Sequence, residues 1–381
     1  MIKYQYPCTE NISLNGFGEY LEHEIGMPRR NIQMFANELN ATFGTSFLTL
    51  TNSGSSANLV AALAMAEKIK YANKPMTAVA SGFTFPTTIS ALLMAGFEVK
   101  LIDVEPEGFN LSVDRLMDEP VPPSLIALTH FLGFPCDMNR ICEYAHNKGA
   151  FILQDACETL NLTTSNGIPY FSLGDITTWS FYHPHHLSSY GGGAVITLNQ
   201  EDFILSDSIA HWGRACKCHI DERLCSVPDG PAHQFTYERL GVNVEMSELN
   251  ACFGRWQLRN WSIIEEKRKQ NYAILYNRLK DCPNLKVWAM PRIGGSPFVF
   301  PVMLRNGMTI YDAYRILSAQ GIEIRTLMGG ATCKQEAYLG KITFDDQMNA
   351  LAMTDKTFFV GIHHTLSLEN VEFVADAIAG V

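Results

Sequence analysis

The 381-residue sequence has no apolar run long enough to cross a bilayer. Its longest apolar stretches, at residues 59–66 and 91–97, are far shorter than the ~20 residues that a membrane-spanning helix needs. The first residues, Met1-Ile2-Lys3-Tyr4, do not lead into the apolar segment of a secretory signal. We therefore expect a soluble, cytoplasmic protein that makes no membrane contact.

Positive charge is also scarce. The chain has 29 Lys and Arg against 39 Asp and Glu, which gives a net charge of −10. No basic stripe is visible, so the sequence does not have the character of a nucleic-acid binder. Hydrophobic residues make up 47% of the chain and charged residues only 18%, which excludes wholesale disorder and predicts a large core.

What the chain does have is ten cysteines. In a cytoplasmic protein of this size, cysteines are more often core thiols or metal ligands than disulfides. Their positions along the chain therefore become informative once the fold is considered.

Short β-rich segments alternate with helical ones between residues 45 and 200, which indicates a largely parallel sheet covered by helices on both faces. A helical stretch follows at 245–280, and a shorter α+β pattern begins after Pro283. We predict an α/β domain over residues 1–260 and a smaller α+β domain over 261–381. The expected strands are 77–80, 100–104, 124–130, 151–155, 176–181, 194–198, 298–304 and 322–325, and the expected helices include 86–96, 137–148, 309–320 and 368–379.

A candidate phosphate site lies at Gly54-Ser55-Ser56, directly before an alanine-rich helical segment. Free backbone amides, two hydroxyls and the positive end of a helix dipole meet in such a turn. The alternative interpretation is an ordinary serine helix cap.

Two further residues follow predicted strands. Phe85 is either a core side chain or an aromatic platform for a ligand. Asp155 ends a strand, where an acid points into the ligand-binding crevice of a parallel sheet or caps the next helix.

A third segment, Ser180-Phe181-Tyr182-His183-Pro184-His185-His186, leads into three glycines at 191–193. Its histidines do not have the spacing of a metal site, because adjacent side chains on an extended segment point apart.

In this order and spacing, these segments resemble the nucleotide-sugar aminotransferases, a family of fold-type I pyridoxal-phosphate (PLP) enzymes. The resemblance extends over almost the whole chain and includes Gly241-x-Asn243 and the segment 247–251. It implies a large sheet domain, a smaller α+β domain, and a homodimer with active sites at the interface.

The resemblance also implies roles for individual residues. Asp155 would pair with the pyridinium nitrogen and Phe85 would stack on the ring. The phosphate would be held by Gly54, Ser55, Ser56, Ser180 and, from the neighbouring subunit, Asn243. Substrate contacts would come from Arg325, His363 and His364.

One departure from the family changes the expected reaction. Aminotransferases of this family form a Schiff base with a lysine at the position that His185 occupies here, and no lysine lies between Lys148 and Lys217. A histidine in this place resembles the branch of 3-dehydratases that act on 4-keto-6-deoxy nucleotide sugars, such as the CDP-4-keto-6-deoxyglucose 3-dehydratases. These enzymes hold pyridoxamine phosphate (PMP) without a covalent link. Their histidine removes a proton from the cofactor, and the C3 hydroxyl leaves.

Four of the cysteines, Cys157, Cys216, Cys218 and Cys225, resemble the ligands of a [2Fe–2S] cluster found in one subgroup of this branch. That subgroup receives electrons from a reductase. The other subgroup has no metal and regenerates its amine from glutamate. A third interpretation treats the four as unrelated thiols.

We therefore expect a PMP-dependent 3-dehydratase of a nucleotide sugar, active in deoxysugar and polysaccharide biosynthesis. The alternatives are a metal-free dehydratase fed by glutamate, and a non-catalytic relative that binds the cofactor or a nucleotide sugar.

Overall fold

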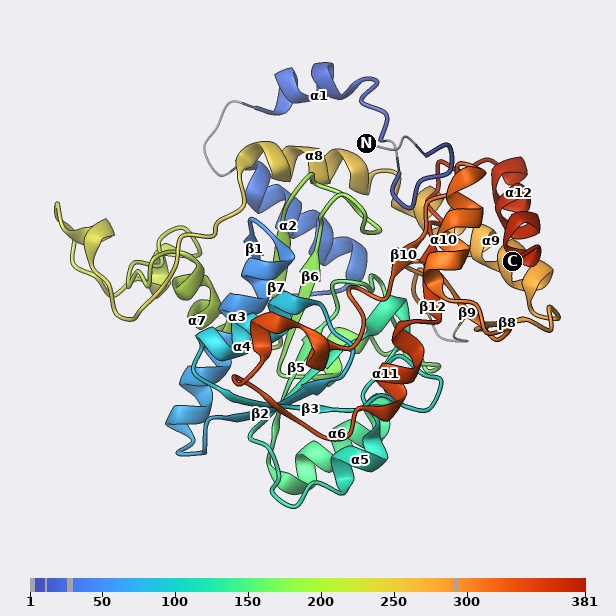
Figure 1. Ribbon diagram of the computed structural model, residues 1–381. Helices are drawn as coiled ribbons and strands as arrows, with labels where there is room; N and C mark the ends of the chain where they lie inside the picture. Colours follow the sequence, from blue (N-terminus) through green and yellow to red (C-terminus); the bar gives the residue numbers. More distant parts are fainter. Residues whose placement is uncertain (1–3, 11, 26–29, 291–293) are drawn as a thin grey trace.

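The computed structural model describes residues 4–10, 12–25, 30–290 and 294–381. Over these residues the chain forms an eight-stranded and a four-stranded sheet (Figure 1). The strands of the large sheet, in spatial order, are β1 (Phe47–Thr51), β7 (Gly193–Thr197), β6 (Ile176–Ser180), β5 (Phe151–Asp155), β4 (Leu125–Thr129), β2 (Thr77–Ser81), β3 (Glu98–Ile102) and β11 (Thr343–Phe344).

The large sheet is mixed. All neighbouring pairs from β6 to β11 run parallel, whereas β7 is antiparallel to both β6 and β1. Because parallel strands share one direction, β4, β5 and β6 bring their last residues, Thr129, Asp155 and Ser180, to the same edge. This is the edge at which parallel sheets bind ligands.

Helices cover both faces of this sheet (Figure 1). On one face lie α3 (Gly54–Tyr71), α4 (Pro86–Met94) and α7 (Gln200–Ala210). On the other lie α5 (Val113–Met117) and α6 (Met138–Lys148), together with α2 (Arg30–Phe43) and α8 (Glu248–Leu258). A short helix, α1 (Phe17–Glu24), packs against α8 through the edge-to-face rings of Phe17 and Phe253, 4.9 Å apart.

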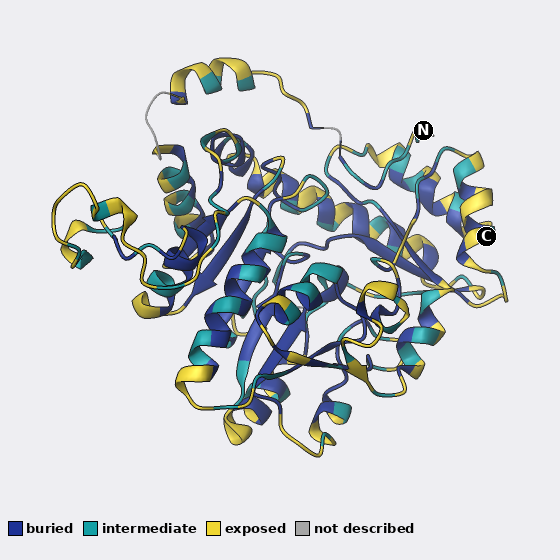
Figure 2. Ribbon diagram, turned by 60° about the vertical axis from the view of Figure 1, so that its left-hand side comes forward, coloured by how far each residue is buried: buried dark blue, intermediate teal, exposed yellow. Residues whose placement is uncertain are grey.

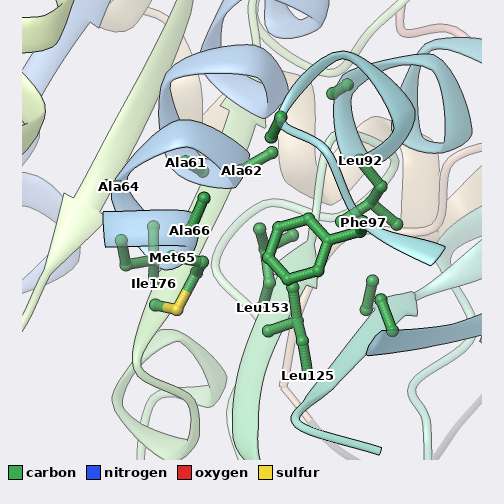
Figure 3. Close-up of a cluster of buried hydrophobic side chains, with 14 of the residues drawn as sticks. Ala61, Ala62, Ala64, Met65, Ala66, Leu92, Phe97, Leu125, Leu153 and Ile176 are labelled. Atoms are coloured by element: carbon green, nitrogen blue, oxygen red, sulfur yellow. The ribbon is translucent and has the colours of Figure 1, made fainter. Parts of the chain in front are cut away.

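Helix α3 packs on the sheet through small side chains, because its alanines let the backbone approach. Ala61, Ala64 and Met65 are fully buried, and they meet Phe97 and Leu125 in one apolar cluster (Figure 3). Small side chains on a central helix allow close packing at native density. The beginning of this helix is therefore held firmly above the edge of the sheet.

The second sheet is antiparallel, and its strands are β10 (Arg325–Thr326), β12 (Thr357–Val360), β9 (Phe300–Leu304) and β8 (Leu285–Val287). Three helices pack on it: α9 (Trp261–Leu279), α10 (Ile310–Ala319) and α12 (Leu368–Ala379). The segment carrying β11 and α11 (Met348–Thr354) instead joins the edge of the large sheet, where backbone groups of α11 donate to Asp103. The boundary at residue 260 stays a prediction.

Six single-turn 3₁₀ helices complete the elements of the described ranges: η1 (Phe131–Gly133), η2 (Tyr170–Leu173), η3 (Glu222–Leu224), η4 (His233–Phe235), η5 (Thr332–Lys334) and η6 (Glu336–Tyr338). No helix among the described residues is long and apolar enough to cross a membrane.

Between α7 and α8 the chain leaves the body as a projecting arm, residues 212–243 (Figure 1). Two isolated bridges close its base, pairing His211 with Asn243 and Arg214 with Tyr237. Most of the arm is exposed or half-buried (Figure 2). The sequence analysis identified no element here, and the arm has no regular structure beyond η3 and η4.

Candidate active site

A cavity of about 810 Å³ opens at the carboxyl edge of the large sheet, beside the second sheet. Eight of the candidate site residues line it: Gly54, Ser55, Phe85, Asp155, Cys157, Ser180, His185 and Arg325. These eight residues lie up to 271 positions apart in the sequence, from Gly54 to Arg325.

The floor of the cavity includes the N-terminus of α3. Ser53 caps the helix by accepting a hydrogen bond from the Ser56 amide at 3.1 Å. A Cβ on Gly54 would lie 2.6 Å from the Cβ of Ser180, so only glycine fits between helix and strand. The free amides of the first turn thus face the cavity together with the Ser55 and Ser180 hydroxyls, an arrangement suited to an anion.

Ser56 is placed differently from its neighbours. Its hydroxyl donates to Asn52 Oδ1 at 2.6 Å, and it is not among the residues that line the cavity. Ser53, which the sequence analysis did not name, lines the cavity instead.

Asp155 is almost fully buried, with 2% of its surface exposed. Its Oδ2 accepts hydrogen bonds from Asn58 Nδ2 at 2.8 Å and Thr88 Oγ1 at 2.5 Å, and Oδ1 accepts one from the Cys157 amide at 3.1 Å. These three donors fix the orientation of the carboxylate in a cavity of low polarity. Phe85, at the start of α4, lines the same cavity and is 44% exposed, so its ring is available to a ligand.

His185 lies in the loop after β6, and its ring stacks on Phe298 with centroids 5.1 Å apart. Its Nδ1 is buried and has no hydrogen-bond partner among the described residues. Burial, and then the nearby Arg268 guanidinium, lower the pKa of His185 to about 3. The imidazole is therefore neutral and able to accept a proton.

The neighbouring histidines point elsewhere. His186 bonds through Nε2 to the Ser296 carbonyl at 2.8 Å, and His183 stacks on Tyr190. Among the described residues, no group of side chains able to hold a metal includes these three histidines.

Of the three residues predicted to contact the substrate, one lines the cavity and two do not. Arg325 lines the cavity, and its Nε donates to Glu323 Oε1 at 2.9 Å. His363 and His364 do not line it. Both ring nitrogens of His363 are engaged, with Thr365 Oγ1 and the Pro7 carbonyl, and His364 pairs with Glu10 at 2.9 Å. Their positions give no support to the predicted substrate contacts.

Asn243 also lies away from the cavity of its own chain, exposed at the base of the arm. A role at the phosphate of its own subunit is therefore excluded by position, and a role in a neighbouring subunit stays a prediction.

Glu158 is a cavity residue that the sequence analysis did not single out. It is fully buried, its Oε2 accepts a hydrogen bond from the Leu132 amide, and burial raises its pKa to about 8. Its position three residues after Asp155, in the turn that follows β5, could have indicated that Glu158 lies near the strand end.

The four predicted cysteine ligands lie in two places within one chain, and their role as cluster ligands stays a prediction. Cys216, Cys218 and Cys225 do lie together in the arm, but the fourth member of their group is His233. Cys157 lines the cavity instead, next to Asp155, and burial raises the pKa of its thiol well above the usual value. The spacing in the sequence could not separate these two locations.

Comparisons with known proteins agree with this architecture. The profile of the DegT/DnrJ/EryC1/StrS aminotransferase family matches residues 8–379. The dTDP-4-dehydro-2,6-dideoxy-D-glucose 3-dehydratase of Saccharopolyspora spinosa is 29% identical over 372 residues, covering 92% of this chain and 79% of that protein. The GDP-4-keto-6-deoxy-D-mannose 3-dehydratase of Escherichia coli O55:H7 is 24% identical over 391 residues, covering 99% of this chain and 100% of that protein.

Among solved structures, the E. coli GDP-4-keto-6-deoxy-D-mannose 3-dehydratase with bound hydrated PLP superposes with a TM-score of 0.88 at 20% identity, covering 98% of this chain and 99% of that chain. This likeness confirms the predicted fold.

Proposed function

Because the chain belongs to the DegT/DnrJ/EryC1/StrS aminotransferase family, we propose that it is a PMP-dependent 3-dehydratase of a 4-keto-6-deoxy nucleotide sugar. The observation that carries the proposal is the neutral, half-buried His185 on the cavity wall, together with the absence of lysine among the described residues that line the cavity. The names of the two curated relatives, both 3-dehydratases of nucleotide sugars, support it.

The lining residues fit the cofactor. Gly54 leaves a space that a Cβ would fill, the α3 amides and two serine hydroxyls suit its phosphate, and Asp155 offers an oriented carboxylate to its ring nitrogen. When bound, PMP supplies an amine for the sugar ketone and a ring that withdraws electrons.

In this proposal each residue has a defined task. Asp155 would hold positive charge on the ring nitrogen, because three hydrogen bonds fix its carboxylate. Phe85 would cover the ring. His185 would accept a proton from the methylene carbon of the cofactor and would deliver it to the departing C3 hydroxyl, since its imidazole is neutral. Without a lysine in reach, the cofactor stays uncoupled from the chain.

Two routes can restore the cofactor for the next turnover. The predicted [2Fe–2S] cluster, which would work with a reductase, uses Cys157, Cys216, Cys218 and Cys225, and within one chain Cys157 lies apart from the other three. We therefore propose the route in which glutamate returns the amine. The expected test is spectroscopic: glutamate alone converts added PLP to PMP on the protein, and a requirement for a reductase would contradict this route.

We also propose a homodimer. The exposed position of Asn243 at the base of a projecting arm is consistent with a contact to the phosphate of the neighbouring subunit.

The test of the main proposal uses the purified full-length protein with PMP and a panel of 4-keto-6-deoxy nucleotide sugars. Mass spectrometry should detect a product lighter by one oxygen atom for at least one sugar, because the C3 oxygen is lost while PMP is oxidised to PLP and ammonia, and the His185→Asn variant should not form it. Binding of PMP without a 3-deoxy product from any sugar would favour a non-catalytic relative. A cofactor trapped on a lysine by borohydride would refute the proposal.

A further inference from the structure

Four potential metal ligands meet in the arm, outside the proposed active site. They are the Sγ atoms of Cys216, Cys218 and Cys225 and a ring nitrogen of His233, and all lie within 4.8 Å of one another. Nε2 of His233 is 3.3 Å from Cys218 Sγ and 3.5 Å from Cys225 Sγ. The four atoms therefore enclose a space the size of one ion.

The two N···S distances are close to the edge of a single coordination tetrahedron, and the 4.8 Å limit keeps the remaining pairs near that size. With Zn–S bonds of about 2.3 Å and Zn–N bonds of about 2.0 Å, ligand atoms around one zinc lie roughly 3.5–3.8 Å apart. A [2Fe–2S] cluster divides four ligands between two irons, so ligands on different irons lie farther apart than one tetrahedral edge. The compact group thus favours one ion over a cluster.

The hydrogen bond at Nδ1 of His233 leaves its Nε2 free to bind a metal ion. Its Nδ1 lies 3.1 Å from the Pro228 carbonyl, an acceptor, so this nitrogen carries the proton. Nε2 then presents its lone pair to the sulfurs. A backbone carbonyl on the other ring nitrogen is the usual support of a metal-binding histidine.

The arm has little else to hold it together. Phe235, Tyr237 and Leu240 are 66%, 52% and 93% exposed, so they form no core of their own. The one helical turn between the ligands is η3, and η4 begins at His233. Segments without an apolar core commonly depend on a metal for their folded state.

The ligand group is tied to the body and open to solvent. His219, next to Cys218, bonds through Nε2 to Asp207 of α7 at 2.6 Å. An open hollow of about 530 Å³, lined in part by Cys218, Cys225 and His233, gives an ion access from solvent.

From this geometry we propose that Cys216, Cys218, Cys225 and His233 bind one Zn²⁺ ion that fixes the folded arm. The site does not involve Cys157 and is independent of the proposed dehydration. Zinc requires no redox partner, and the thiol protons pass to solvent when it binds.

The first test is metal content. Full-length protein purified without oxygen from cells supplied with both iron and zinc is assayed for metals and acid-labile sulfide. We expect about one zinc per chain, no iron and no sulfide. Iron with sulfide, or protein without metal, would overturn the proposal.

Variants then assign the ligands. His233→Ala and Cys218→Ser should lose the zinc, whereas Cys157→Ser and the matched thiol control Cys282→Ser should keep it. Retention of zinc by His233→Ala, or its loss in Cys157→Ser, would contradict the ligand set.

Two measurements need no variant. X-ray absorption of the zinc protein should fit three sulfurs at about 2.3 Å and one nitrogen at about 2.0 Å, and a shell of four sulfurs would exclude His233. Removal of zinc by a chelator should accelerate tryptic cleavage at Lys217 and Arg223, roughly tenfold or more, with the rest of the chain intact. An unchanged cleavage rate would show that zinc does not fix the arm.

Discussion

Replacing Asp155 with asparagine tests the cofactor site most specifically. The carboxylate is 2% exposed, and two donors converge on Oδ2 while a third faces Oδ1. Asparagine can present its oxygen to the first two only by pointing its NH₂ at the Cys157 amide. We therefore expect a loss of about 1–3 kcal/mol in the free energy of unfolding, the usual penalty for an unmatched buried polar group.

The larger effect should be on the cofactor. Asparagine removes the negative charge that faces the ring nitrogen, and a charged hydrogen bond contributes about 1.5–3 kcal/mol, which corresponds to roughly 10- to 150-fold weaker binding. Fluorescence titration with PLP measures this change directly.

Asp175→Asn is the matched control. Asp175 precedes β6 at the opposite end of the strand and accepts a hydrogen bond from the Ile152 amide at 2.7 Å. It should leave PLP affinity unchanged. If Asp155→Asn binds PLP within twofold of the unmodified protein, the assignment of the cavity to this cofactor is refuted.

Three other outcomes are expected. His185→Asn should bind PMP normally but lose dehydration by at least about 100-fold, the usual contribution of a general base, in a coupled product assay. Gly54→Ala places a Cβ 2.6 Å from Ser180 and should cost about 1–3 kcal/mol in thermal unfolding and weaken PLP binding, whereas Gly18→Ala, with nothing within 4 Å, should do neither. Burial raises the pKa of Glu158 from 4.5 to about 8, so the folded chain keeps a proton that the unfolded chain releases, and stability should fall as the pH rises between these values. Glu158→Gln should flatten that fall in melting curves recorded across this range, and equal slopes would contradict the buried acid.

Much of the sheet could be predicted because its strands are apolar runs that end in turns. The expected strand at 151–155 and the expected helix at 368–379 agree with the structure to the residue. The strand expected at 322–325 was largely wrong, since β10 covers only Arg325–Thr326. The two-residue β11 exists only through its pairing with β3, a contact that local sequence does not encode.

The site residues could be predicted at positions where the chemistry of the residue type suggests one role. Asp155 and His185 are such cases, and both line the cavity. The roles of the histidines near the C-terminus could not be predicted, because both ring nitrogens of His363 have hydrogen-bond partners within the chain. The cysteines show the same limit. Order and spacing grouped Cys157 with the arm, although a β-strand end and a projecting loop hold them apart.

The central claim is that His185 moves the cofactor proton that starts dehydration. Its most direct test is the loss of deuterium from PMP labelled at the methylene carbon, followed with a 4-keto-6-deoxy nucleotide sugar that the protein dehydrates. We expect rapid loss of label together with water release in the unmodified protein, and retention of label in His185→Asn. Equal loss of label in the variant would contradict it.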